Sequence, residues 1–200
     1  MNALERYQTL LTPEDCAIVL VDYLTGFDPG LRTMPRERWD RNVAAFVRLA
    51  AAFQARTPVL VLGDEGGFRG RFHPALAEHL PDAPRFERHT PSALRSGPFR
   101  GTLAATGRRR VVIGGISLDL CTLHTSLDLL REGYEVFVVV DCSGTESELV
   151  QTAAMLRLTQ AGAVMTSWVS LASELMGDWQ TPEGEKVGAL YQELSAWGGQ

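Results

Sequence analysis

Short apolar runs recur along the chain, and segments with helical spacing separate them. Runs without polar alternation are typical of strands that are covered on both faces. Five such runs predict strands over residues 16–21, 58–62, 109–114, 136–140 and 163–166, and the segment 85–88 predicts a short further strand. The chain therefore alternates predicted strands with longer segments, which is the order expected of β–α–β units.

The segments between the runs have the apolar spacing of amphipathic helices. Helices are predicted over residues 36–56, 73–80, 96–106 and 146–160, and from Cys121 to about Gly133. Right-handed β–α–β units then predict an α/β fold, a three-layer α/β/α structure around a mostly parallel six-stranded sheet. The whole chain, 1–200, is interpreted as one domain with a helical tail from about residue 168, which Pro182 is expected to interrupt.

Charge and cysteine usage narrow the function classes. The net charge is −5, and the short run Arg108–Arg110 is the one basic cluster, so a dedicated nucleic-acid binder is not expected. No apolar run approaches the ~20 residues that span a bilayer, and residues 1–11 lack the pattern of a secretory signal. The three cysteines have neither zinc-ligand nor disulfide spacing, which predicts reduced thiols in a cytoplasmic protein without a bound metal.

Three chemically distinct side chains fall next to predicted strand ends. Asp22 ends the first strand, Arg88 ends the third, and Cys121 begins the helix after the fourth. In open parallel sheets the carboxyl ends of the strands form the ligand-binding edge. A carboxylate, a cation and a thiol that meet there are the parts of a thiol hydrolase, although singly they could be a cap, a surface cation and a buried apolar side chain.

Cys121 has the position of an activated nucleophile. The unpaired N–H groups of a first helical turn favour an anion, so the turn is expected to lower the pKa of the thiol. His124 lies one turn further along the same helix and is interpreted as an ordinary interior or surface residue. Asp64 would need a nearby histidine to form a metal site, and Gly66 occupies the place where one would lie.

Longer motifs around these residues resemble a known family. They are Ile18–Asp22, the segment from Arg88 to Leu94 that contains Ser92-Ala93-Leu94, the segment from Gly114 to Cys121, and Val140-Asp141. In this order and spacing the chain resembles the isochorismatase-like cysteine hydrolases. The C-terminal half, with Asp141-Cys-Ser-Gly-Thr145, is more similar to the YcaC-type subgroup.

The resemblance implies a catalytic set and a mechanism. Asp22 matches the family's aspartate, Cys121 its nucleophile, and Arg88 the position that is usually lysine. It also implies a cis peptide between Ile116 and Ser117, with the N–H groups of Ser117 and Cys121 as an oxyanion hole. The implied activity is hydrolysis of an amide or ureide C–N bond in a small molecule, with no cofactor or metal. Tyr23, Phe27 and Phe68 are weaker candidates for the substrate wall.

Assembly and alternative functions complete the hypothesis. Trp168, Trp179 and Trp197 in the tail, together with the resemblance, predict a homo-oligomer. One alternative is a catalytically idle relative that serves as an oligomeric binding or scaffold protein. Another is a thiol-redox protein in which Cys142 approaches Cys121.

Overall fold

The computed structural model describes residues 7–198, so residues 1–6 of the stretch searched for a secretory signal lie outside it. Within that range one sheet is formed in the order β3-β2-β1-β4-β5-β6, and all neighbouring strands are parallel. The strands are β1 (Cys16–Val21), β2 (Val59–Leu62), β3 (Arg85–Phe86), β4 (Arg110–Gly115), β5 (Glu135–Val139) and β6 (Val164–Thr166). The predicted three-layer α/β/α fold is confirmed.

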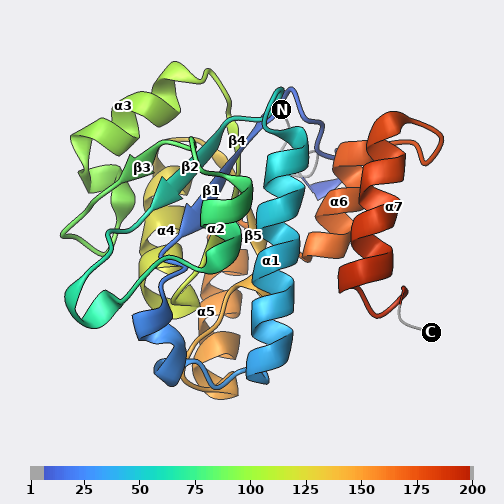
Figure 1. Cartoon of the computed structure of the whole chain (residues 1–200). Coiled ribbons are helices and arrows are strands. Elements are labelled where there is room, and N and C mark those ends of the chain that lie inside the picture. The colour runs from blue at the N-terminus through green and yellow to red at the C-terminus, as the bar shows by residue number, and fades with distance from the viewer. Residues whose placement is uncertain (1–6, 199–200) are drawn as a thin grey trace.

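Seven α-helices of the described chain cover the two faces of this sheet (Figure 1). They are α1 (Arg36–Phe53), α2 (Pro74–His79), α3 (Gly97–Ala105), α4 (Leu123–Arg131), α5 (Glu148–Gln160), α6 (Trp168–Met176) and α7 (Pro182–Leu194). Helices α1, α2, α6 and α7 pack on one face, and α3, α4 and α5 pack on the other. Alternate residues of β1 supply the two cores, because successive side chains of a strand point to opposite faces.

Two local expectations need correction. β3 ends at Phe86, so Arg88 lies two residues beyond the strand and not at its end. Pro182 begins α7 instead of interrupting a helix, and the break between α6 and α7 lies at residues 177–181. The proline is tolerated there because the first helical turn needs no N–H from that position.

The C-terminal helices belong to the main core. Trp168 and Leu171 of α6 and Val187 and Leu190 of α7 are buried in the same cluster as Phe46 of α1. Figure 1 shows α6 and α7 side by side next to α1. None of the described helices is both long enough and apolar enough to cross a bilayer.

Candidate active site

The site forms where the order of the strands reverses, between β1 and β4. Val21 and Gly115 are partners at the carboxyl ends of these strands, and the N–H of Ile116 donates to the carbonyl of Val21 at 2.9 Å. A Cβ atom on Gly115 would lie 2.0 Å from that carbonyl oxygen, so only glycine allows this close approach. Residues that follow the two strands therefore leave the sheet side by side, at the position where open α/β sheets bind ligands.

Asp22 and Arg88 form a buried ion pair at this edge. Asp22 has a φ of 49°, a left-handed conformation that aspartate tolerates better than most residues, and its N–H donates to the carbonyl of Leu62 at 3.0 Å. Nη2 of Arg88 donates to the Asp22 carboxylate, and its Nη1 donates to the Thr90 carbonyl at 2.7 Å. Two hydrogen bonds therefore fix the Arg88 guanidinium, although Arg88 lies beyond the end of β3.

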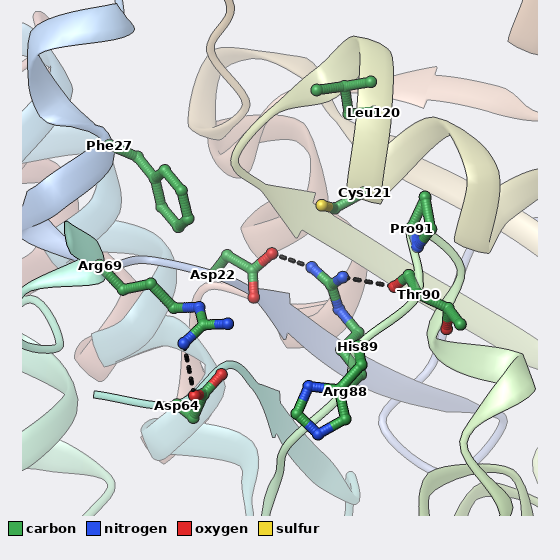
Figure 2. A pocket seen from close by; sticks show the side chains of 10 residues that line it. All are labelled: Asp22, Phe27, Asp64, Arg69, Arg88, His89, Thr90, Pro91, Leu120 and Cys121. Carbon is green, nitrogen blue, oxygen red and sulfur yellow. Dashed lines mark hydrogen bonds and ion pairs between the residues drawn. The ribbon is translucent and has the colours of Figure 1, made fainter. Parts of the chain in front are cut away.

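Cys121 lies in a single π-helical turn, Leu118–Thr122, that leads directly into α4. Its thiol is half-buried, and Figure 2 shows the sulfur turned toward the Asp22–Arg88 pair. Burial and the nearby charge of Asp22 raise the pKa of the thiol to about 11, and the opposing effect of Arg88 is smaller. The expectation of a lowered pKa was therefore wrong, because burial and the Asp22 carboxylate have the largest effects on this thiol.

The pKa of the Asp22 carboxyl is shifted in the same direction as that of the Cys121 thiol. Burial raises its pKa above the ordinary value, while the positive charge of Arg88 and the contact with Cys121 oppose that rise. A higher pKa makes the ionised carboxylate a stronger base than an exposed aspartate. The site thus holds a protonated thiol beside a carboxylate that can accept its proton.

The turn between β4 and the π-helical turn contains a cis peptide bond between Ile116 and Ser117. The Asp119 carboxylate holds this turn by accepting hydrogen bonds from the hydroxyls of Ser117 and Thr145, at 2.5 and 2.7 Å. The N–H of Leu118 donates to the carbonyl of Gly144 at 2.9 Å. In the described part of the chain the N–H of Ser117 makes no hydrogen bond, so this donor is available for a ligand oxygen.

These groups open into a cavity of about 300 Å³. It is lined by Asp22, Phe27, Asp64, Arg69, Arg88, His89, Thr90, Pro91, Leu120 and Cys121 (Figure 2). An adjoining hollow of about 190 Å³ shares Phe27 and Leu120 with it and reaches Ile116 and Ser117. The two hollows therefore adjoin at Phe27 and Leu120, and Cys121 lines the first while Ser117 lines the second.

Comparison with known proteins shows the family of the chain. The sequence profile described as the isochorismatase domain matches residues 16–170. The chain belongs to the isochorismatase family. It is 34% identical to the probable hydrolase YcaC of Escherichia coli strain K12 over 171 residues, which cover 85% of this chain and 82% of that protein. It is also 32% identical to a secreted isochorismatase effector, Isc1, of Phytophthora sojae, over 72% of this chain and 71% of the effector.

Two solved structures share the fold of this isochorismatase-family chain over nearly its whole length. YcaC from Pseudomonas aeruginosa, solved with hexane-2,5-diol and covalent acrylamide, is 32% identical with a TM-score of 0.88, covering 93% of this chain and 92% of that one. YcaC from Escherichia coli is 31% identical with the same TM-score, covering 93% and 91%, and is described as an octameric hydrolase of unknown specificity.

The aromatic residues that were expected to line the cavity of this family member divide into three cases. Phe27 lines it. Tyr23 does not: it is 2% exposed, packs in the core beneath α1, and donates its hydroxyl to the carbonyl of Cys142 at 2.8 Å. Phe68 also lies outside the lining, exposed at the rim, where its ring meets that of Phe27 edge to face with centroids 6.0 Å apart.

Sequence reasoning missed several residues of the lining. Asp64 and Arg69 come from the glycine-rich loop after β2 and form an ion pair at 2.8 Å. His89 follows Arg88 directly, and Leu120 precedes Cys121. The position of Asp64 after a strand end was a usable signal, whereas Arg69 enters the site only because its loop folds back against Thr25 and Gly26.

Other residues that could act as partners of Cys121 lie elsewhere. His124 lines a separate hollow with Arg95 and Asp128. Cys142 is fully buried in the core of the opposite sheet face and donates its thiol to the carbonyl of Asn42 at 3.3 Å, and its pKa is raised well above the ordinary value by burial. Among the described residues no group of three or more His, Cys, Asp or Glu side chains could hold a metal ion.

Proposed function

We propose that this isochorismatase-family protein is a cysteine hydrolase that cleaves the C–N bond of a small amide or ureide. The observation that carries the proposal is the convergence of Cys121, Asp22 and Arg88 at one cavity at the reversal point of the sheet. A nucleophile, a base within reach and a charge that orients the base are the three parts that such chemistry needs.

The first half of the reaction makes a thioester. Sγ of Cys121 attacks the carbonyl carbon while its proton passes to the Asp22 carboxylate. The negative charge on the former carbonyl oxygen is stabilised by the N–H groups of Ser117 and Cys121, and one such donor contributes about 2.7–4 kcal/mol in other enzymes. The C–N bond then breaks as Asp22 returns the proton to nitrogen, and the amine or ammonia leaves.

The second half regenerates the thiol. Asp22 takes a proton from a water molecule that attacks the thioester carbon, the C–S bond breaks, and the proton returns to sulfur as the acid departs. Arg88 does not move a proton, because a guanidinium stays charged at neutral pH. Its positive charge opposes the effect of burial on the pKa of Asp22 and stabilises the thiolate as that charge develops.

A relative supports a reactive nucleophile. The YcaC structure from Pseudomonas aeruginosa contains covalent acrylamide. Acrylamide is an electrophile that thiolates attack, so a covalent adduct in a relative of 32% identity fits a nucleophilic cysteine. The expectation that no cofactor takes part stays a prediction.

We also propose that the chain forms a homo-oligomer. The Escherichia coli YcaC structure is described as octameric and superposes over 93% of this chain. Apolar side chains that remain on the surface of this chain include Trp179 at 53% and Trp197 at 84% exposure. Large apolar side chains that stay in water are common at protein–protein contacts.

Turnover of a panel of small amides and ureides, followed by release of ammonia or amine, tests the hydrolase. We expect Cys121→Ala to abolish turnover and Asp22→Asn to reduce kcat by a factor of about 10²–10⁴, the usual contribution of a general acid–base. Acid quenching of Asp22→Asn during turnover should show the acyl group on Cys121 by mass spectrometry, since deacylation also needs the base.

Each rival function gives a different result. An idle scaffold would turn over no member of the panel, and Cys121→Ala would leave its assembly unchanged. A thiol-redox protein would form a reversible bond between Cys121 and Cys142 under mild oxidation, which peptide mapping detects. The burial of Cys142 on the opposite sheet face disfavours that outcome.

A further inference from the structure

The wall of the Cys121 cavity carries charges, but they are paired. Arg88 donates to Asp22, and Nη1 of Arg69 lies 2.8 Å from Oδ2 of Asp64. Figure 2 shows Arg88 on one side of the Asp22 carboxylate and the Arg69–Asp64 pair on the other. Neither a carboxylate nor a guanidinium of the lining is therefore left without an oppositely charged partner.

Arg69 is also restrained on a second side. Its guanidinium carbon lies 5.2 Å from the centre of the Phe68 ring, while Asp64 holds its Nη1. The loop that carries both residues is fixed against Gly26, whose Cβ would lie 1.8 Å from the carbonyl oxygen of Phe68. The loop, the Phe68 ring and the Asp64 carboxylate all restrain Arg69. Its guanidinium is therefore already paired and is not available as a partner for a substrate anion.

The rest of the lining is partly apolar, with His89 and Thr90 as further polar residues, and the cavity is small. Phe27, Pro91 and Leu120 line it beside the charged pairs. A volume of about 300 Å³ is at the lower end of the range for ligand sites. The space therefore suits a compact molecule with a short apolar group next to the carbonyl that Cys121 attacks.

We propose that this cavity selects small uncharged amides and rejects those that carry a carboxylate or an ammonium group. A substrate anion would add an unpaired negative charge beside Asp22 and Asp64, and a substrate cation would add an unpaired positive charge beside Arg69 and Arg88. In a partly desolvated site an unpaired charge is strongly disfavoured. Turnover of such amides rests on the proposed hydrolase, whereas the selection itself is a property of the cavity.

Within this proposal Asp64 is a specificity-determining residue. Its carboxylate neutralises Arg69, and its replacement by asparagine keeps the shape but leaves Arg69 as an unpaired cation. We expect Asp64→Asn to make the cavity accept anions. Arg69→Gln should have the opposite effect, because it leaves Asp64 unpaired and makes the cavity net negative.

Two alkylating reagents measure the selection without any turnover. Iodoacetamide is neutral and iodoacetate is anionic, and both react with the same thiolate, so their rate ratio at Cys121 is independent of the thiol pKa. After division by the same ratio for free 2-mercaptoethanol, we expect iodoacetate to be disfavoured about tenfold or more. Equal ratios for protein and free thiol, or a preference for iodoacetate, would overturn the proposal.

The variants make the test specific. Asp64→Asn should raise the iodoacetate-to-iodoacetamide ratio about tenfold and Arg69→Gln should lower it. Asp82→Asn and Arg38→Gln remove the same charges at exposed positions away from the cavity and should leave the ratio at the wild-type value. Equal changes in cavity and control variants would show that net charge, and not the cavity, sets the ratio.

A substrate series connects the selection to catalysis. Butanamide, succinamate and 3-aminopropanamide differ in one end group, which is a methyl, a carboxylate or an ammonium. We expect kcat/KM for butanamide to exceed that for each charged amide about tenfold. If none of the three is hydrolysed, the proposed function fails on this series while the alkylation ratio still decides the selection; faster turnover of succinamate would contradict the selection alone.

Discussion

At the scale of single residues, the site combines a thiol that is hard to ionise with a carboxylate that is hard to ionise. Burial raises the pKa of both Cys121 and Asp22. Both shifts disfavour a resting thiolate and favour proton transfer from thiol to carboxylate as the C–S bond forms. In the proposed mechanism Cys121 is therefore activated by Asp22 as the C–S bond forms, and not by its position at the start of a helix.

The pH dependence of Cys121 alkylation tests these electrostatics. With a pKa of about 11, the thiol is protonated at neutral pH, so the rate should rise with pH through the neutral range. Arg88→Ala removes a cation, raises that pKa and should lower the rate at fixed pH about tenfold, while Arg88→Lys should stay near wild type. Asp22→Asn removes an anion, lowers the pKa and should raise the rate.

Peptide mapping gives the control for this measurement. Cys16 and Cys142 are buried, so Cys121 should be the residue labelled first. If Arg88→Ala leaves the pH profile of Cys121 alkylation unshifted, Arg88 does not belong to the site. Labelling at Cys16 or Cys142 as fast as at Cys121 would contradict the assignment of the nucleophile.

The sequence predicted the three residues of the proposed catalytic set but not the walls around them. Asp22 and Cys121 follow long apolar strands, whose ends meet wherever the sheet is parallel. Tyr23 was misplaced because the left-handed backbone at Asp22 turns the chain, so that the next side chain enters the core beneath α1. The position of Arg69 depends on the path of an irregular loop, which no periodic sequence pattern predicts.

At the scale of elements, the turn that carries the nucleophile is held by the segment after β5. Asp119 joins Ser117 to Thr145, and the Ser143 hydroxyl accepts from the N–H of Gly115 at 3.1 Å. Sequence patterns predicted the ends of most strands and helices to within two residues, because the buried face of each element shows in the spacing of its apolar residues. They did not predict the π-helical turn, which depends on these tertiary hydrogen bonds.

Removing the Thr145 hydroxyl tests whether the hydrogen bonds of Asp119 to Ser117 and Thr145 position Ser117. Thr145→Val keeps the side-chain shape but deletes the hydrogen bond to Asp119, so the N–H of Ser117 should be less well aimed at the oxyanion. We expect kcat to fall about tenfold with KM nearly unchanged, because the lost interaction acts in the transition state. The free energy of unfolding should fall by about 1 kcal/mol.

Two measurements separate positioning from general damage. Thr152→Val deletes a hydroxyl that donates to the Glu148 carbonyl on the exposed side of α5 and should leave kcat unchanged. Cys121 alkylation in Thr145→Val should stay within about twofold of wild type, since that reaction develops no oxyanion. A parallel loss of alkylation and kcat would mean that the whole turn has moved.

At the scale of the whole molecule, the order of the strands determines where the site lies. β1 and β4 are parallel neighbours, and the sheet continues through β2 on one side and through β5 on the other. Asp22, Arg88 and Cys121 all lie at the carboxyl edge near that division. The layers beneath are continuous apolar cores on both faces. The loops that carry the site are therefore separate from both cores, so that changes in them need not disturb the fold.

Exposed apolar side chains predict how copies of this chain assemble. Apolar side chains stay exposed on α5 and in the C-terminal region, at Leu149, Leu156, Trp179 and Trp197. Their burial between copies would be driven by the hydrophobic effect, so the oligomer should persist at high salt, where exposed ion pairs are screened. Multi-angle light scattering at 0.1 M and 1 M salt should give a mass several times the 21.9 kDa of one chain. A single-chain mass at micromolar concentration would contradict the homo-oligomer, and a mass that falls at high salt would assign the contacts to charged residues instead.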